Sequence, residues 1–96
     1  SAADILSSRL MVLNAAHILE TKGVKYAMKD ISLIKFYVAN ALGRVMDRAL
    51  QVHGGLGMSD DTPIAGYFRG ERAARIYDGA DEVHKISVAK RILREY

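Results

Sequence analysis

The sequence predicts an all-α protein, built as a four-helix up-and-down bundle. Apolar residues recur every three or four positions along four stretches, short connectors join those stretches, and no stretch shows the alternating pattern of a half-buried strand. The 96 residues are enough for one domain or for part of one. The absence of cysteine excludes a disulfide framework and thiolate metal sites, while a hydrophobic content of 50% excludes a disordered chain.

The first helix is predicted from about residue 3 to residue 21. Gly23 follows it and can adopt the left-handed backbone conformation that ends many helices. The helix begins almost at residue 1, which indicates a chain that starts inside a larger protein. Its apolar residues form a broad stripe at helical spacing: Ile5, Leu6, Leu10, Val12, Leu13, Ala16 and Leu19.

The second predicted helix is the longest. It begins between Tyr26 and Asp30, with Asp30 as a candidate N-cap, and it ends at Gly54-Gly55. Because its apolar residues spread over more than one face, we expect neighbours on more than one side. Steps of three and four separate its main apolar residues over more than three heptads: Ile31, Ile34, Val38, Ala41, Val45, Ala49 and Val52.

Two shorter helices complete the predicted bundle. A polar, glycine-rich loop over residues 54–61 leads to Thr62 as N-cap and to Pro63 at the first helical position, where a missing N–H is harmless. The third helix then spans about 63–77. The dipeptide Asp78-Gly79 breaks it, and the fourth helix runs from residue 80 or 81 to residue 94.

The net charge is +3, and the clearest cluster of charge is the spacing of Arg69, Arg72 and Arg75 along the third helix. A small nucleic-acid-binding or interaction module could use such a stripe on phosphates. A solvated face, with the arginines paired to Glu71 and Asp78, explains it better, since no block of five like charges occurs. No apolar stretch approaches the ~18 residues of a membrane-spanning helix. We therefore expect a soluble protein that binds neither nucleic acid nor a membrane.

Metal-ligating residues are scattered. His17, His53 and His84 lack the i, i+4 pairing of a helical metal site. Asp60-Asp61 is not followed by the regularly spaced oxygen ligands of a calcium loop. The sequence therefore predicts no metal site.

Two segments carry candidate chemistry, and the first is residues 51–57 (QVHGGLG). The simpler interpretation is a helix end followed by a flexible turn. In the functional interpretation, backbone without side chains at Gly54 and Gly55 admits a flat or anionic ligand, to which Gln51 donates a hydrogen bond. The sequence alone leaves both open.

The second segment is residues 77–82 (YDGADE), which gathers three carboxylates where one helix ends and the next begins. Most such breaks are structural. A carboxyl in a dry cleft here would have its pKa raised by burial and by its acidic neighbours, while nearby helix N–H groups would lower it. Such a group could act as a general base.

In this order, residues 51–57, 67–69 (YFR) and 75–84 (RIYDGADEVH) resemble the C-terminal helical domain of the acyl-CoA dehydrogenases. That family shows a Gln-x-x-Gly-Gly-x-Gly loop, a Tyr-Arg-Asp-like helix and a Tyr-Glu-Gly-Thr corner. The resemblance covers essentially all 96 residues, which form a partial bundle domain without the family's first helix and its flavin-binding segment. It implies an inactive C-terminal fragment of a larger enzyme, with apolar surface left exposed.

The resemblance implies an FAD-dependent enzyme that converts an acyl-CoA to a trans-2-enoyl-CoA. Asp78 is then the catalytic base, unless the base lies on the missing helix, and Gly79 borders the substrate thioester. The positions that the family uses for FAD are Gln51, Gly54 and Gly55, at a neighbouring subunit's cofactor, and Ala80 and Glu82, at the flavin nucleotide.

Partners and location follow from the same resemblance: a homodimer or tetramer in fatty acid β-oxidation, an electron-transfer flavoprotein as electron acceptor, and the cytoplasm of a prokaryote or the mitochondrial matrix. Three departures keep an alternative open. Asp78 replaces the commoner Glu, as in a nitroalkane-oxidising relative, so a nitroalkane oxidase on this scaffold is the second hypothesis. Ala80 replaces a Thr, and Lys90 replaces an Arg.

Overall fold

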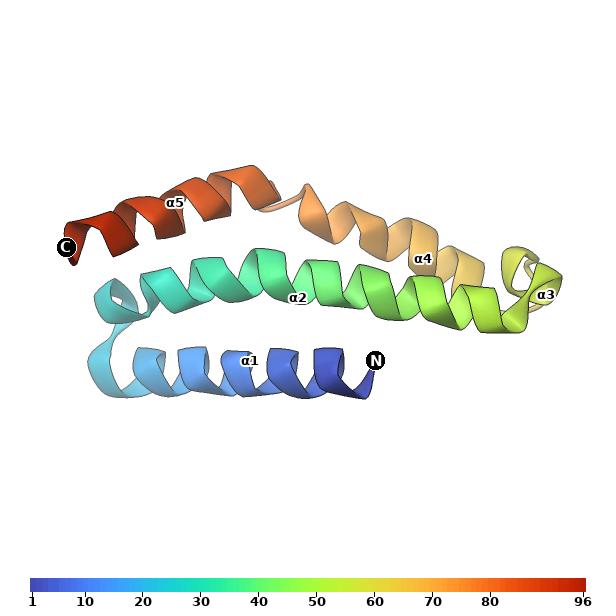
Figure 1. Ribbon diagram of the computed structural model, residues 1–96, viewed down its shortest axis with the longest axis horizontal. Helices are drawn as coiled ribbons and strands as arrows, with labels where there is room; N and C mark the ends of the chain where they lie inside the picture. Colours follow the sequence, from blue (N-terminus) through green and yellow to red (C-terminus); the bar gives the residue numbers. More distant parts are fainter.

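The long helix α2 (Val24–His53) is at the centre of the molecule (Figure 1). The other long helices pack along it, and a short helical turn lies at its C-terminal end. The computed structural model describes all residues, 1–96. Helix α1 (Ala2–Lys22) runs antiparallel to α2 on one side. Only Gly23, with φ of 89°, separates the two helices, so α2 begins at Val24 and the predicted N-cap at Asp30 is wrong.

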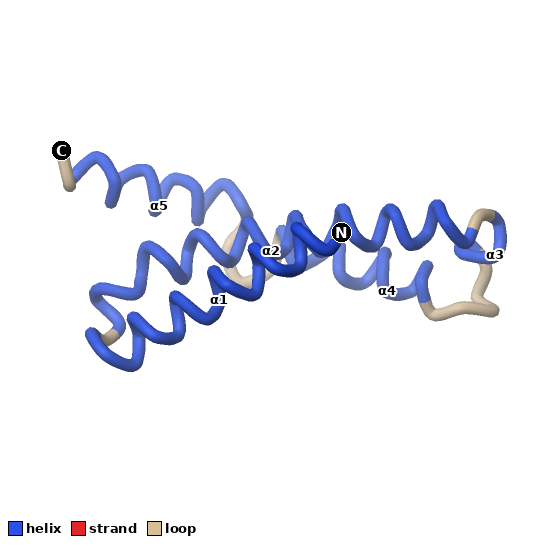
Figure 2. The backbone as a smooth tube through the Cα atoms, turned by 60° about the horizontal axis from the view of Figure 1, so that its bottom comes forward, coloured by secondary structure: helices blue, strands red, loops and turns tan.

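The opposite side of α2 carries the rest of the chain. The single turn α3 (Gly55–Met58) reverses its direction, α4 (Ile64–Glu71) and the 3₁₀ turn η1 (Arg72–Arg75) run back along α2, and α5 (Asp81–Arg94) continues in the same direction. The view in Figure 2 shows α4 and α5 end to end against successive parts of α2. The chain is all-α with no strand, which confirms the predicted all-α class. The predicted up-and-down order of four helices is wrong, because α4 and α5 run in the same direction along α2.

The third helix differs most from its prediction. It begins at Ile64, so Pro63 occupies the N-cap position, and the Thr62 hydroxyl is buried without a hydrogen-bond partner. The expected span of 63–77 ends early because the α-helix tightens into η1 after Glu71, a common ending at a helix C-terminus. The predicted loop over 54–61 contains the short α3.

The core is thin and made of small side chains. Alanines let α1, α4 and α5 approach the α2 backbone closely, but each buries little apolar area. The buried hydrophobic residues are Ala15, Ala27, Ala39, Ala41, Ala65, Ala74 and Val88.

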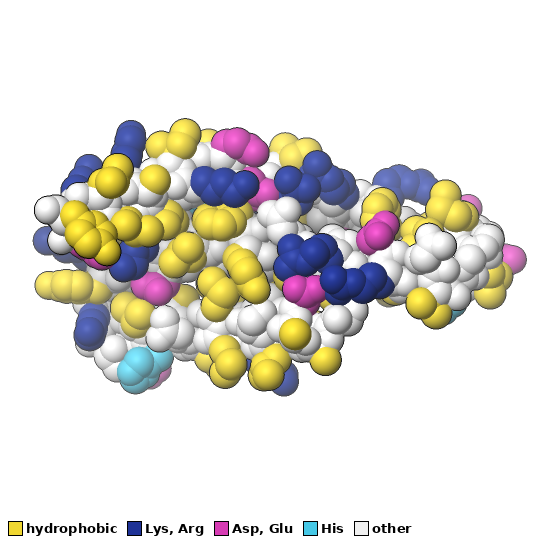
Figure 3. Space-filling view, in the orientation of Figure 1, with side chains coloured by type: hydrophobic (Ala, Val, Ile, Leu, Met, Phe, Trp, Pro, Cys, Tyr) yellow, Lys and Arg dark blue, Asp and Glu magenta, His cyan; other side chains and the backbone are white.

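Large apolar side chains remain on the surface. Leu6 and Leu13 of α1 are each 59% exposed, and Leu93 of α5 is 72% exposed. Figure 3 shows hydrophobic side chains along both the α1 edge and the α5 edge of the molecule. The exposed apolar surface expected from the sequence is therefore present. No helix is long and apolar enough to cross a lipid bilayer.

Charged groups add a clamp between α1 and α2. Arg44 Nη2 and Arg48 Nη1 each lie 2.8 Å from a carboxylate oxygen of Asp4. Hydrogen bonds from these two arginines hold the pKa of the Asp4 carboxyl well below its usual range. The clamp stabilises the packing of the first turn of α1 on α2 while Asp4 is ionised.

Asp4→Asn is expected to lower the melting temperature at pH 7, because the Asn side chain pairs weakly with both arginines. The difference in melting temperature between the variant and the unaltered chain should shrink as the pH falls below about 4. Below this pH Asp4 is protonated in the unfolded state but still ionised in the folded state. Thermal circular dichroism at pH 7 and pH 3 measures this. Asp47→Asn on α2, whose carboxylate makes no ion pair, is the control; equal effects from both changes would contradict the clamp.

Candidate functional site

The corner between η1 and α5, residues 76–80, has an unusual backbone. Asp78 has φ of 52° and Gly79 has φ of 91°, so two consecutive residues are left-handed. Aspartate is among the few side chains that tolerate this conformation, and glycine adopts it freely. A Cβ at position 79 would also lie 2.7 Å from His84 Nε2, but this imidazole can shift, so it is the φ of 91° that favours glycine here.

Lys35 connects α2 to this corner. Its Nζ donates hydrogen bonds to the carbonyls of Ala74 at 2.7 Å, Tyr77 at 2.9 Å and Gly79 at 3.2 Å. The ammonium also lies 5.3 Å from the centre of the Tyr77 ring, within cation–π range. All three N–H donors of the lysine therefore have partners in or beside the corner.

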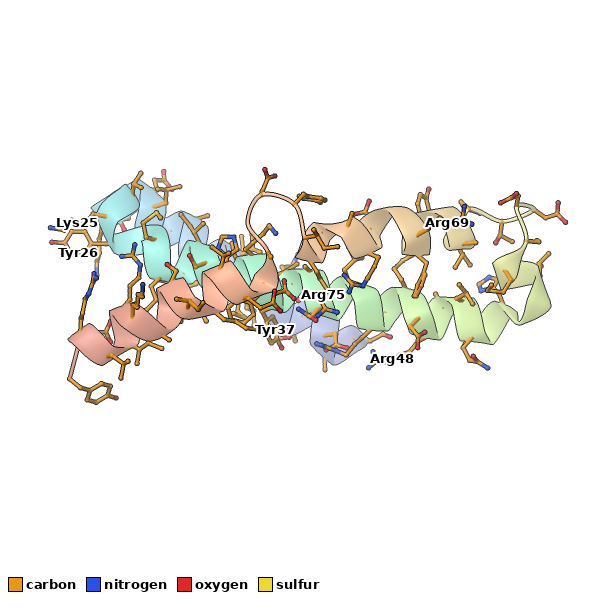
Figure 4. The ribbon with its side chains drawn as sticks, turned by 90° about the horizontal axis from the view of Figure 1, so that it is seen from above. Lys25, Tyr26, Tyr37, Arg48, Arg69 and Arg75 are labelled. Carbon is orange, nitrogen blue, oxygen red and sulfur yellow. The ribbon has the colours of Figure 1, made fainter.

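Asp81 forms the second connection, and it is the buried carboxylate of the corner, 1% exposed. Its Oδ2 accepts hydrogen bonds from Asn40 Nδ2 and from Arg75 Nε, both at 2.8 Å. Burial alone would raise the pKa of Asp81, but the hydrogen bonds from Arg75 and Asn40 outweigh it, and the pKa is lowered. Figure 4 shows Arg75 beside the start of α5.

The candidate base Asp78 differs from Asp81. It is exposed, and its carboxylate makes no hydrogen bond or ion pair, while its carbonyl oxygen lies 3.1 Å from His84 Nε2. The position of this carboxylate is therefore set by the backbone of the corner. Gly79 and Ala80 are half-buried beside it, and Glu82 is exposed in the first turn of α5.

The glycine-rich segment lies at the far end of α2. Gln51 is exposed in the last turn, and Gly54 ends the helix with φ of 59° and ψ of −141°. Nothing lies within 4 Å of where a Cβ would stand on Gly54 or Gly55. Gly57 has a packing role instead, because a Cβ there would lie 2.8 Å from the Leu50 carbonyl oxygen.

The predicted site residues thus form two groups in one chain. Asp78, Gly79, Ala80 and Glu82 lie together at the corner. The second group, Gln51, Gly54 and Gly55, lies at the C-terminal end of α2. Gln51 is 11 residues beyond Asn40, which contacts Asp81, and this is about 17 Å along the helix axis at 1.5 Å per residue.

The arginine stripe is not the paired surface that the sequence predicted. Neither Glu71 nor Asp78 makes an ion pair, and Arg75 instead turns inward to Asp81. The buried carboxylate needs a cationic partner, whereas an exposed pair gains little. Arg69 and Arg72 remain exposed.

Sequence reasoning missed Lys35 and Asn40, and gave Asp81 and Arg75 no role at the corner. The available signal was weak: Lys35 and Asn40 interrupt the apolar pattern of the longest predicted helix. Polar residues in such a pattern indicate buried hydrogen-bond partners, but their partners lie about 40 positions further along the sequence.

Comparisons with known proteins point to one family. Residues 1–93 match the sequence model of the family described as acyl-CoA dehydrogenase, C-terminal domain. Acyl-CoA dehydrogenase family member 10 of Mus musculus is 45% identical over 94 residues, which are 98% of this chain and 9% of that protein. Family member 11 of Rattus norvegicus is 44% identical over 87 residues, 91% of this chain and 11% of that protein.

Two solved structures are also similar. One from Mycobacterium abscessus, assigned to the acyl-CoA dehydrogenases, has a TM-score of 0.96 at 42% identity and covers 99% of this chain and 23% of its own. An electron-transferring flavoprotein of Acidaminococcus fermentans has a TM-score of 0.87 at 29% identity, over 97% and 24% of the two chains. The chain spans less than a quarter of each of these four proteins.

Asp81→Asn is expected to destabilise the fold by about 2 kcal/mol at pH 7, the usual size for a lost hydrogen-bonded charge. Because the pKa of Asp81 is lowered by folding, its contribution exists above the ordinary aspartate pKa and is lost as the pH falls below it. Urea unfolding at pH 7 and at pH 3.5 measures both effects. Glu82→Gln, the exposed neighbour in the same helical turn, is the control and should change stability by less than about 0.5 kcal/mol.

Proposed function

The chain belongs to the acyl-CoA dehydrogenase family, as its C-terminal domain, and on this basis we propose that it supplies the catalytic base of an FAD-dependent acyl-CoA dehydrogenase. The observation that carries the proposal is the corner at Asp78. Two left-handed residues present an unpaired carboxylate, and Lys35 donates hydrogen bonds to backbone carbonyls on both sides of it. Asn40 and Arg75 hold the side chain of the adjacent Asp81. The resemblance of residues 77–82 to the family's corner motif, in which the carboxylate before the glycine is the base, supports the assignment.

In this proposal Asp78 removes the α-proton of an acyl-CoA thioester and becomes a carboxylic acid. The α-proton is weakly acidic, so the reaction also needs hydrogen bonds to the thioester oxygen, which the backbone near Gly79 borders. FAD, when bound, supplies the acceptor for the hydride that leaves the β-carbon. The product is a trans-2-enoyl-CoA.

The loop is proposed to bind FAD, and its residues fit such a group. Gly54 and Gly55 expose bare backbone with open space around both Cα atoms, so a flat ring or a phosphate can approach closely. Gln51 precedes them with an exposed amide. As the resemblance to the family implies, we assign the loop to a neighbouring subunit's FAD. Ala80 and Glu82 are assigned to the flavin nucleotide at the corner.

The same proposal includes the partners of the whole enzyme. A homodimer or tetramer would cover apolar residues that α1 and α5 expose here. Acyl-CoA is the substrate and an electron-transfer flavoprotein the electron acceptor, in fatty acid β-oxidation in a prokaryotic cytoplasm or a mitochondrial matrix. The nucleic-acid-binding alternative loses support because Arg75 is engaged by Asp81 and is not part of a surface stripe.

Asp78→Asn in the full-length polypeptide is expected to lower turnover by on the order of 10²–10⁴-fold while visible flavin absorbance is retained. Asn tolerates the left-handed backbone and has the same size, so the change removes only the charge. Gln51→Ala is the matched comparison and should weaken FAD retention without removing the base. Full turnover in Asp78→Asn would show that the base is a residue other than Asp78.

Substrate class is a separate prediction. Acyl-CoA is expected to bleach the flavin of the full-length protein under anaerobic conditions, and a nitroalkane is not. The aspartate at the base position makes nitroalkane oxidation the second candidate, so bleaching by nitroalkane alone would replace the acyl-CoA assignment. The 96-residue chain by itself should carry no stoichiometric flavin and show no turnover with either substrate.

A further inference from the structure

We infer that Lys35 is a positioning residue, which sets the location of the Asp78 carboxylate by holding the backbone on both sides of it. Two of its acceptors, the carbonyls of Ala74 and Tyr77, precede Asp78 in the chain, and the third, that of Gly79, follows it. The inference rests on the proposed function, in which Asp78 is the base.

The chemistry of the contact supports this role. An ammonium has three N–H donors, and Lys35 directs all of them at backbone carbonyls without an ion pair to any carboxylate. Hydrogen bonds from a charged donor are roughly twice as strong as neutral ones. The carbonyls of Ala74 and Tyr77 lie at the C-terminal end of the α4–η1 segment, where a cation is also favoured by the helix dipole.

The backbone needs such support. The left-handed φ of Asp78, a residue other than glycine, costs free energy and persists only where the surroundings hold it. The Asp78 side chain has no hydrogen bond of its own, so anchors on adjacent carbonyls determine where its Cβ lies and hence which space its carboxylate can reach. His84 contacts the Asp78 carbonyl at 3.1 Å from α5, but only Lys35 connects the corner to α2 on both sides of Asp78.

Lys35→Met in the full-length holoenzyme tests the inference, because methionine keeps most of the stem and removes the donors. We expect kcat to fall about 10- to 100-fold, as for a base displaced by about 1 Å, with KM and flavin content changed less than about threefold. The deuterium isotope effect with α-deuterated acyl-CoA should rise, because proton removal becomes more rate-limiting. Lys25→Met, on the exposed first turn of the same helix (Figure 4), is the control and should match the unaltered enzyme.

A double-mutant cycle separates positioning from general stability. If Lys35 acts through Asp78, the variant with both Lys35→Met and Asp78→Asn is no slower than Asp78→Asn alone. Multiplied losses, or an unchanged kcat and isotope effect in Lys35→Met, would overturn the inference. Should Lys35→Met fail to fold, Lys35→Arg takes its place in the same cycle, because it keeps the charge but cannot aim three donors from one atom. Turnover retained by Asp78→Asn would instead overturn the proposed function itself.

Discussion

The buried carboxylate of Asp81 is the contact on which the rest of this molecule depends. It joins three parts that are distant in sequence: Asn40 in the middle of α2, Arg75 in η1 and the first turn of α5. A carboxylate that is 1% exposed is costly unless it is paired and hydrogen-bonded, so burial of Asp81 favours the arrangement in which all three parts meet at this place. The start of α5, and with it the corner that carries Asp78, is located by this requirement.

These hydrogen bonds determine how the helices are placed because the apolar core fixes the positions of the helices relative to one another only weakly. Six of the seven buried hydrophobic residues are alanines, which permit close helix packing but interlock little. Helices that meet through such a seam could shift along one another at small cost. Lys35, Asn40 and Arg75 prevent this, since a hydrogen bond fails when its atoms move by about an ångström.

The elements that follow from local sequence were predicted well. The periodic apolar stripes predicted α1 and α5 to within one residue and the end of α2 at Gly54, and Gly23 ended the first helix as expected. The errors have tertiary causes. Asp30 resembles an N-cap, but Gly23 completes the turn in one residue and α2 begins earlier. Its spacing placed Arg75 in a solvated stripe, but its side chain forms an ion pair with the buried Asp81. The corner and the loop were recognised as motifs, whereas the contacts of Lys35 depend on pairing across about 40 residues and could not be read from the pattern.

The continuity of helix α2 also limits where residues can be inserted into or deleted from the chain. It carries the glycine loop at one end and holds the corner near its middle, and no joint interrupts the helix between Asn40 and Gln51. One inserted residue there would advance the loop by 1.5 Å and rotate it by about 100° around the helix axis, turning Gln51 to another side of the molecule. The continuous helix therefore fixes the distance and the angle between the loop and the corner, whereas the turns at Gly23 and at residues 59–63 can change in length without altering either.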